Sequence, residues 1–289
     1  MATSKTTSIH LIGPRASGKT TYLATLAYFP HSKHLKTKFA NLAVTYPKNS
    51  TTEKLARQAE DIIKKGAKLA GTRRGVVDSI PFYPFLMRIP GQIKEIEIVF
   101  RDIAGEIFED IPLEHEFIHV EPYLTSLFNT LSWMIMLTDW QPSQDKHLYK
   151  PAFEKLCQQI SEYEQVNSIV KKLRIAIVLS KCERGEIWSG RLEPEEDLFK
   201  VRLPETYDFL RYKFPQYTNR LKFFACSSFG VLSTYPVSFD PRPNRYIPDD
   251  GSSAEYNAFL RDPEQWQPFG LISPIYWLTT GKTLNDLRL

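Results

Sequence analysis

The sequence predicts an α/β fold in which a mostly parallel sheet carries helices on both faces and an antiparallel strand near one edge. Segments with the apolar runs of strands alternate with segments of helical periodicity along most of the 289 residues. Three runs, 133–137, 174–179 and 221–225, are continuously apolar, as expected for strands whose two faces are both covered. There is no internal repeat, and one α/β domain over 1–289 with long insertions is predicted.

The first elements are a strand over 8–12, which Gly13 ends, and a helix over 19–28. The next is an amphipathic helix over 51–70, for which Thr51 or Thr52 can serve as the N-cap. Segments 85–89 and 93–100 then predict two strands of an antiparallel hairpin around Pro90-Gly91, because residues 96, 98 and 100 alternate as apolar positions.

The second half places helices near 123–129 and 151–172 between the three apolar strands. Residues 233–267 are rich in Pro, Asp, Asn and Ser, and this composition predicts a long irregular insertion, about 233–268. A closing helix over 270–279 is expected to pack Leu271, Ile275 and Leu278 on the sheet.

Composition narrows the class of protein. Hydrophobic residues make up 42% and charged residues 24%, which is ordinary for a globular domain. The net charge of +4 comes without a dense Lys/Arg tract, so we expect no nucleic acid as partner. Three cysteines without CxxC spacing favour a reduced, cytoplasmic protein. The apolar runs are too short for a membrane segment.

The strongest motif is Gly13-Pro14-Arg15-Ala16-Ser17-Gly18-Lys19-Thr20, a full GxxxxGK[ST] pattern between a predicted strand and a predicted helix. Glycines let the backbone wrap tightly, so that its N–H groups can surround phosphate oxygens at a helix N-terminus. Lys19 is expected to reach the β- and γ-phosphates, and the Thr20 hydroxyl to bind Mg²⁺. The motif predicts a P-loop nucleotide-binding fold whose phosphate contacts are Gly13, Arg15, Ala16, Ser17, Gly18, Lys19, Thr20 and Thr21.

A second motif, Asp102-Ile103-Ala104-Gly105, follows the second strand of the predicted hairpin. An Asp at this position is expected to bind Mg²⁺ through water, and the Gly105 N–H can be offered to a γ-phosphate. DxxG alone is common, but its position after a hairpin strand and downstream of a P-loop makes it a strong signal.

Together the two motifs resemble the translation-factor-related class of P-loop GTPases, which includes the small Ras-like switches. The resemblance covers nearly the whole chain, from the P-loop to the last helix. It implies GTP or GDP as the bound nucleotide, Mg²⁺ as its metal and a protein effector or regulator as partner. It also makes 31–84 the switch I region.

Base recognition is then expected at Leu179-Ser180-Lys181-Cys182-Glu183, where this class carries Asn/Thr-Lys-x-Asp. Lys181 matches the lysine whose stem covers the guanine. Glu183 stands where the class has the Asp that accepts from guanine N1–H and the 2-amino group, and it is one methylene longer. Ser180 replaces the usual Asn or Thr. Ala225-Cys226-Ser227-Ser228 looks like the Ser-Ala-Lys segment, which assigns Ser227 and Ser228 to the base.

A narrower resemblance links the GPRxSGKTTYL opening, the DIAGE segment and the late helix beginning Gly270-Leu271-Ile272 to the bacterial double-GTPase families. Those families occur in multi-gene systems of conflict and defence.

The switch I threonine has several candidates: Thr37, Thr45, Thr51, Thr52 and Thr72. Thr72 is chosen as metal ligand and catalytic residue because it ends a helix shortly before the hairpin, although an exposed turn explains it equally well.

Two residues depart from the small-GTPase pattern. Glu106 stands where these switches have the Gln that orients the attacking water, and its charge approaches the γ-phosphate. Arg15 replaces a small residue, so it either supplies positive charge itself or points to solvent. Slow hydrolysis is therefore expected.

His115-Glu116-Phe117-Ile118-His119 spells HExxH, a pattern that binds Zn²⁺ when it lies on a helix. We interpret it as a polar surface segment, because it follows DxxG, lacks a convincing third ligand, and is followed by Pro122, which is expected to interrupt a helix.

The predicted function is a Mg²⁺-dependent GTP-binding switch with slow hydrolysis that acts on a protein partner. Two alternatives stay open: an ATPase of the same fold, and a pseudo-GTPase interaction module that holds nucleotide without turnover. The position of Lys181 and Glu183 relative to the base separates the first alternative, and a turnover measurement separates the second.

Overall fold

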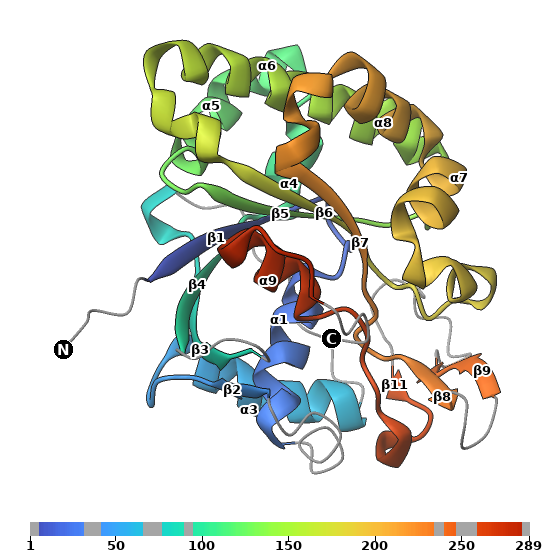
Figure 1. Ribbon diagram of the computed structural model, residues 1–289. Coiled ribbons are helices and arrows are strands. Elements are labelled where there is room, and N and C mark those ends of the chain that lie inside the picture. The colour runs from blue at the N-terminus through green and yellow to red at the C-terminus, as the bar shows by residue number, and fades with distance from the viewer. Residues whose placement is uncertain are drawn as a thin grey trace.

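The protein contains a seven-stranded mixed sheet with helices on both faces (Figure 1). The computed structural model describes residues 6–31, 42–65, 77–89, 95–233, 240–246 and 259–284. The strand order is β2-β3-β4-β1-β5-β6-β7. The strands are β1 (Thr7–Ile12), β2 (Ala43–Thr45), β3 (Phe82–Arg88), β4 (Ile96–Asp102), β5 (Ser132–Leu137), β6 (Arg174–Leu179) and β7 (Leu221–Ala225).

The pairing directions confirm the predicted fold class. Strand β1 lies between β4 and β5 and is parallel to both, and β5, β6 and β7 continue the parallel part. Strand β3 is antiparallel to β4, as the predicted hairpin requires, and β2 is antiparallel to β3 at the edge. The carboxyl ends of β1, β4, β5, β6 and β7 therefore meet along one edge of the sheet, where ligand sites of parallel sheets are found.

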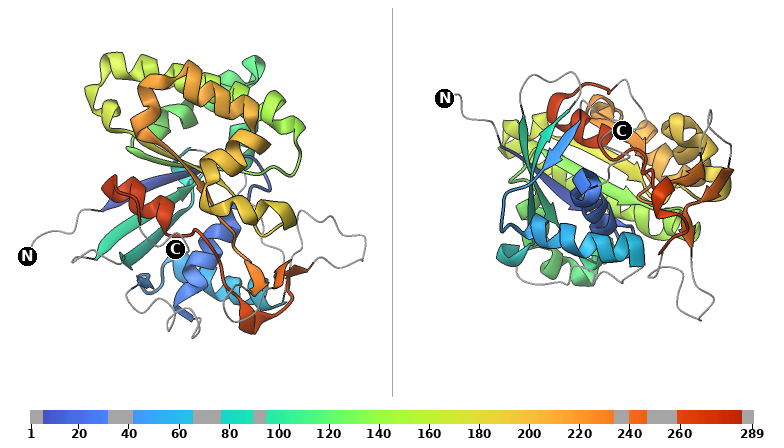
Figure 2. Two further views of the ribbon diagram at one scale, coloured as in Figure 1. Left: turned by 45° about the vertical axis from the view of Figure 1, so that its right-hand side comes forward. Right: turned by 90° about the horizontal axis from the view of Figure 1, so that it is seen from below.

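The helices form two layers, one on each face of the sheet, as the views of Figures 1 and 2 show. One layer contains α1 (Lys19–Tyr28), α3 (Thr51–Lys65) and α9 (Ser273–Thr280). The other contains α4 (Gly105–Asp110), α5 (Phe117–Leu127), α6 (Lys150–Val166), α7 (Lys200–Arg202) and α8 (Pro204–Asp208).

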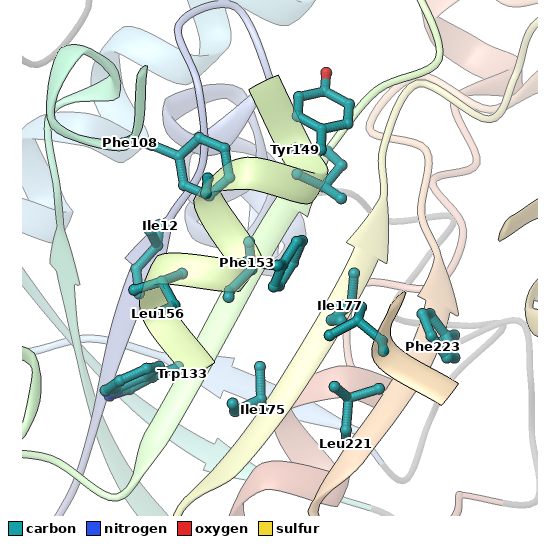
Figure 3. Packing of buried hydrophobic residues seen from close by; sticks show 14 of the residues in the cluster. Ile12, Phe108, Trp133, Tyr149, Phe153, Leu156, Ile175, Ile177, Leu221 and Phe223 are labelled. Carbon is teal, nitrogen blue, oxygen red and sulfur yellow. The ribbon is translucent and has the colours of Figure 1, made fainter. Parts of the chain in front are cut away.

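Each face of the sheet has its own apolar core, because successive side chains of a strand point to opposite faces. In β5, Met134 and Met136 join the core under α1, α3 and α9, whereas Trp133, Ile135 and Leu137 join the core under α4 to α8. Figure 3 shows the second core, where side chains of α6 pack on those of the strands. Burial on both faces explains why these strands are continuously apolar.

Short helical turns connect these elements. The turns, 3₁₀ or π, are η1 (Phe29–His31), η2 (Val77–Ser79), η3 (Glu114–Glu116), η4 (Asp145–Tyr149), η5 (Ser168–Lys172), η6 (Gly185–Ile187), η7 (Ser189–Leu192), η8 (Pro194–Phe199), η9 (Phe209–Lys213), η10 (Pro215–Arg220) and η11 (Pro263–Gln265).

The described parts of the predicted irregular insertion contain strands, which corrects the prediction. Strands β8 (Val231–Ser233) and β9 (Asp240–Pro243) form one two-stranded sheet, and β10 (Arg245–Tyr246) and β11 (Phe259–Leu260) form another. Residues 234–239 and 247–258 of the insertion lie outside the described residues.

Three local predictions need correction. Strand β2 was not predicted, since three residues carry too little periodicity. The N-cap of α3 is Ser50, whose hydroxyl accepts from the Glu53 N–H at 3.2 Å, so neither Thr51 nor Thr52 caps it. Helix α5 continues through Pro122, which was expected to interrupt it. The end of the predicted helix beyond residue 65 and the Pro90-Gly91 turn lie outside the described residues.

Among the described residues no helix is long and apolar enough to cross a membrane. Cys157, Cys182 and Cys226 are buried free thiols, and burial raises the pKa of each.

Candidate functional site: the P-loop and the ends of neighbouring strands

The P-loop connects β1 to α1 with a backbone that only particular residues tolerate. Gly13 has φ +144°, and a Cβ there would lie 2.1 Å from the Met136 carbonyl oxygen of β5. Gly18, which precedes α1, has φ +88°, and Ala16 has φ 57°. A residue with a side chain is strained at such angles, so the two glycines set the shape of the loop.

Lys19 lies at the centre of this loop and is almost fully buried. Its ammonium donates to the carbonyl oxygens of Gly13 at 2.7 Å and Pro14 at 2.9 Å. Burial lowers the pKa of Lys19, and the negative charges of Asp102, Glu109 and Glu106 oppose that shift. Lys19 is thus a buried cation whose ammonium contacts two carbonyl oxygens, with three carboxylates close enough to affect its pKa.

Asp102 and Thr20 meet beside Lys19, as the two motifs predict. Asp102 ends β4 and is fully buried, and the Thr20 hydroxyl at the start of α1 donates to its Oδ2 at 3.4 Å. Both groups are hard oxygen donors, which suit Mg²⁺, an ion that keeps several waters and takes the rest of its ligands from one or two protein groups and phosphates. The donor set therefore fits Mg²⁺.

The DxxG segment packs directly on the P-loop. Gly105 begins α4, and a Cβ there would lie 2.4 Å from the Arg15 backbone nitrogen. No other residue type fits at that contact. One further turn along α4, Glu109 accepts from the Arg15 backbone N–H at 2.8 Å and from Arg15 Nε at 2.7 Å.

Arg15 and Glu106, the two residues that depart from the expected pattern, differ in their exposure. Arg15 is largely exposed, with 63% of its side chain accessible, yet its guanidinium is held by Glu109. Glu106, in the first turn of α4, is partly buried, and its Oε2 has neither exposed surface nor a hydrogen-bond partner.

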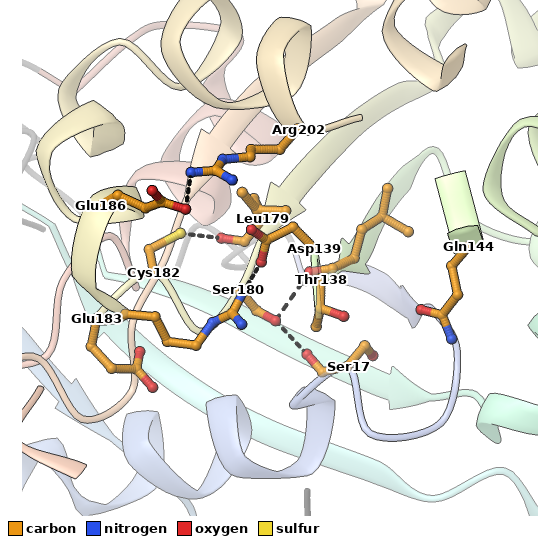
Figure 4. Close-up of polar contacts among 12 residues, drawn as sticks. Ser17, Thr138, Asp139, Gln144, Leu179, Ser180, Cys182, Glu183, Glu186 and Arg202 are labelled. Carbon is orange, nitrogen blue, oxygen red and sulfur yellow. Dashed lines mark hydrogen bonds and ion pairs between the residues drawn. The ribbon is translucent and has the colours of Figure 1, made fainter. Parts of the chain in front are cut away.

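The segment predicted to recognise the base lies at the same edge, after β6. The Ser180 hydroxyl donates to the Ser17 carbonyl oxygen at 2.6 Å and to the Leu137 carbonyl oxygen at 3.1 Å, which ties β6 to the P-loop (Figure 4). Lys181 has φ 60°, and its ammonium lies 5.0 Å from the centre of the Trp140 ring.

Glu183 and Ser227 are hydrogen-bonded to each other. They follow β6 and β7, two neighbouring strands whose carboxyl ends lie side by side. Ser227 Oγ donates to Glu183 Oε2 at 2.7 Å and accepts from the Gly230 N–H at 2.8 Å. Glu183 Oε1 accepts no hydrogen bond and is buried, and Arg245 Nη1 lies 3.5 Å from it. The carboxylate expected to read the base is thus enclosed.

The segment Ser227–Gly230, called here the base loop, is held by the late part of the chain. Ser227 exchanges two backbone hydrogen bonds of 2.9 Å with Phe269. Trp266 Nε1 donates to the Ser228 carbonyl oxygen at 2.9 Å. Ser228 itself is half-buried.

A second pair of charges flanks the base segment. Asp139 follows β5 and forms an ion pair with Arg184, whose guanidinium carbon lies 4.7 Å from the centre of the Trp140 ring. Burial lowers the pKa of Arg184, and the charges of Arg245 and Arg202 add to that shift.

The predicted site residues therefore fall into two groups at one sheet edge. The phosphate group is Gly13, Arg15, Ala16, Ser17, Gly18, Lys19, Thr20, Thr21, Asp102, Gly105 and Glu106, and the base group is Lys181, Glu183, Ser227 and Ser228. Ser180 joins the two groups.

Only three of the five switch I candidates lie among the described residues. Thr72 and Thr37 lie outside the described residues. Thr45, Thr51 and Thr52 donate their hydroxyls to carbonyl oxygens of β3. His115 and His119 of the HExxH segment are exposed, and the described residues contain no cluster of His, Cys, Asp and Glu that could hold a metal.

Sequence reasoning missed five residues: Glu109, Asp139, Trp140, Arg184 and Arg245. Asp139 and Trp140 lie two and three residues after the end of an apolar strand, so the rule that sites gather at the carboxyl ends of parallel strands points to them. Arg245 has no such signal, because it comes from the insertion, far along the chain from Glu183.

No family model matches the chain. No curated protein matches it either. Among solved structures, it is similar to the Ski7 GTPase-like domain of S. cerevisiae bound to GTP, with 16% identity, TM-score 0.36, and coverage of 86% of this chain and 47% of that one. It is also similar to Methanosarcina barkeri Roco2 RocCORdC bound to GDP, with 15% identity, TM-score 0.33, and coverage of 77% and 43%.

A further similar structure is the signal recognition particle receptor SRb-GTP/SRX complex from Chaetomium thermophilum, with 14% identity, TM-score 0.40, and coverage of 78% and 93%. The chain spans less than half the length of the first two of these structures.

Proposed function

We propose that this protein is a guanine-nucleotide switch that binds GTP and GDP with Mg²⁺, hydrolyses GTP slowly and acts on a protein partner. The observation that carries the proposal is the pairing of two half-sites at one sheet edge. Buried Lys19 stands beside Thr20 and Asp102 at one end, and the Glu183–Ser227 pair stands at the other.

At the phosphate end, the backbone N–H groups of the P-loop and the Lys19 ammonium bind the phosphates. Thr20 and Asp102 would hold Mg²⁺, which would neutralise phosphate charge when bound. Gly105 brings the start of α4 against the loop, which supports its N–H as a γ-phosphate contact.

Hydrolysis is attack by water on the γ-phosphorus, in line with the departing GDP, and the protein accelerates it by positioning and charge. Glu106 is the residue that orients this water in the proposal, since its Oε2 is buried without a hydrogen-bond partner. Its negative charge repels the γ-phosphate, and Arg15 is bound by Glu109, so we expect slow turnover.

At the base end, Glu183 selects guanine, because N1–H and the 2-amino group present two donors to one carboxylate. Adenine presents an acceptor at N1 and pairs poorly with it. A lost charged hydrogen-bond pair costs on the order of 2–3 kcal/mol, about a hundredfold in affinity. Lys181 covers the face of the base with its stem.

The partner is proposed from the resemblance stated above. The DIAGE segment and the GPRxSGKTTYL opening support a place for this switch in a bacterial conflict or defence system, where it would bind its partner in one nucleotide state.

The decisive experiment is calorimetric titration of GTP, GDP, ATP and ADP with and without Mg²⁺. We expect GTP and GDP to bind in the presence of Mg²⁺, Lys19→Ala to abolish binding with the fold intact, and Glu183→Ala to lose most of the preference for guanine. Lys200→Ala is the matched control, because Lys200 is an exposed lysine paired with Glu196. Unchanged affinity in Lys19→Ala refutes the phosphate assignment, and equal binding of GTP and ATP supports the ATPase.

Single-turnover GTP hydrolysis by the wild type, Glu106→Gln and Arg15→Gly tests the switch itself. Slow wild-type turnover is expected. Fast turnover that collapses in Glu106→Gln contradicts the slow switch, because Glu106 is then an efficient catalytic residue. Nucleotide binding without turnover in every variant supports the pseudo-GTPase.

A further inference from the structure

The base-reading carboxylate is in contact with an arginine that belongs to the insertion. Arg245 Nη1 of β10 lies 3.5 Å from Glu183 Oε1, with 6% of the Arg245 side chain and 1% of the Glu183 side chain exposed. Glu183 Oε2 is already occupied by Ser227 Oγ. Of the two carboxylate oxygens, Oε1 alone lacks a hydrogen bond, and it is buried.

Hydrogen bonds of the neighbouring residue Asn244 fix the backbone at Arg245. The preceding residue, Asn244, is fully buried, and its N–H donates to the Gly230 carbonyl oxygen of the base loop at 2.9 Å. Its side chain donates to the Asp262 carbonyl oxygen at 2.8 Å and accepts from the Asp262 N–H at 2.8 Å. Strand β10 is therefore fixed both to the base loop and to the end of the insertion.

A base that reads Glu183 must reach an oxygen that has no exposed surface in this arrangement. Guanine presents two donors side by side, so it needs Oε1 as well as Oε2. The Arg245 guanidinium, a donor of the same kind, stands against Oε1 and must move before guanine N1–H or the 2-amino group can donate there.

We propose that Arg245 is a specificity-determining residue of the base site that competes with guanine for Glu183. The inference rests on the proposed function and adds that Arg245 of β10 regulates nucleotide affinity. The chain with Arg245 on Glu183 is closed to the base, and nucleotide binds the fraction in which Arg245 has left. A partner that draws β10 away from the base loop opens the site.

Trp140 reports on this exchange, because the Arg245 guanidinium carbon lies 5.1 Å from the centre of its ring. Departure of Arg245 removes one cation from the indole face and changes the Trp140 emission. The chain has five tryptophans, so Trp140→Phe identifies the part of the signal that comes from this site.

The test is calorimetric titration of GDP with Mg²⁺ into the wild type and Arg245→Gln, which removes the charge and keeps most of the length. Apparent affinity scales with the fraction of open chain, and a minor state of ~0.1–10% predicts GDP binding ~10- to ~1,000-fold tighter in Arg245→Gln. ATP affinity stays unchanged, because adenine does not use Glu183. In a Glu183→Gln background the gain disappears, which a merely structural role of Arg245 does not predict.

The matched control is Arg242→Gln, since Arg242 lies in β9 of the same insertion but pairs with Asp240 in solvent, with 69% of its side chain exposed. It leaves GDP affinity unchanged. If Arg245→Gln does not fold, Arg245→Lys, which retains the charge without the planar fork, must give a smaller gain in the same direction.

The outcomes separate the two levels of the proposal. Unchanged or weaker GDP binding by a folded Arg245 variant overturns the competition and leaves the guanine-nucleotide switch standing, because the wild type still binds GDP. GDP binding by the variant alone supports both. Absence of guanine-nucleotide binding by both proteins overturns both.

Discussion

The Ser180 hydroxyl links the segment after β6 to the P-loop by a hydrogen bond, and Ser180→Ala removes that hydrogen bond. The hydroxyl donates to the Ser17 carbonyl oxygen at 2.6 Å and to the Leu137 carbonyl oxygen at 3.1 Å. Leu137 keeps a donor in the variant, because the Ser180 backbone N–H also donates to it at 2.9 Å. The loss therefore falls on the Ser17 carbonyl, within a buried part of the P-loop.

A buried acceptor that loses its donor costs about 1–3 kcal/mol, and we expect Ser180→Ala to lower the free energy of unfolding by about 2 kcal/mol. Ser180→Thr retains the hydroxyl and is the matched control, with a loss of about 1 kcal/mol from the methyl group added at this buried position. Urea denaturation followed by circular dichroism measures both variants, and a constant slope against urea shows that stability alone has changed.

The same variant weakens nucleotide binding, because the P-loop loses a contact that fixes its backbone. We expect GDP affinity to fall about tenfold in Ser180→Ala, equivalent to about 1.4 kcal/mol, and to stay near wild type in Ser180→Thr. Equal unfolding free energies for Ser180→Ala and the wild type refute the reasoning. So does a stability loss of the same size in both variants, since the methyl group and not the hydrogen bond would then decide it.

Three further predictions concern the scaffold of the site. Burial, with the charge of Arg101 beside it, lowers the pKa of His10 from 6.5 to about 3. Below about pH 6.5 the unfolded chain binds a proton at His10 that the folded chain does not bind, so stability falls as the pH decreases from there toward 3. Urea denaturation should show ~2 kcal/mol less stability at about pH 5 than at about pH 7.5. His10→Leu should lack this part of the loss. Gly13→Ala places a Cβ against a carbonyl of β5 and should cost about 3 kcal/mol or more in thermal unfolding, whereas Gly185→Ala, with open space around it, should cost about 1 kcal/mol. Asp145→Ala strips two backbone N–H groups at the start of α8 of their acceptors and should cost about 2–4 kcal/mol by urea denaturation, against about 0.5 kcal/mol for the exposed Asp208→Ala; equal losses would contradict the capping role.

The parallel strands and the phosphate loop were predictable from the sequence because their signals are local. The strands over 174–179 and 221–225 have the predicted bounds, and so does the helix over 19–28. Continuous apolar runs arise from burial on both faces, and the conformation of the loop depends on glycines that occur in a fixed pattern. The meeting of Glu183 with Ser227 follows in turn, since both residues stand just beyond the ends of neighbouring parallel strands.

What the sequence does not reveal depends on contacts between distant residues. Glu109 and Arg15 form an ion pair although they are 94 residues apart in the sequence, and no local pattern at either residue predicts it. Arg245 approaches Glu183 because Asn244 bonds to the base loop, and the turn-rich composition around it predicts only a loop. Edge strand β2 is set by its partner β3 rather than by its own three residues.

The bridge between Ser227 and Phe269 has a consequence for the time at which the site can form during synthesis. The P-loop leaves the ribosome before the base loop does. The base loop cannot form its two backbone hydrogen bonds to Phe269 until that residue has been made. At roughly 5–20 residues per second, the two events are separated by about 10–50 s. Under the proposed function, a nascent chain of intermediate length carries the phosphate-binding residues before the base loop is fixed, so it would not yet distinguish one nucleoside polyphosphate from another. Under that function, discrimination between nucleotides arises only after Phe269 has been made.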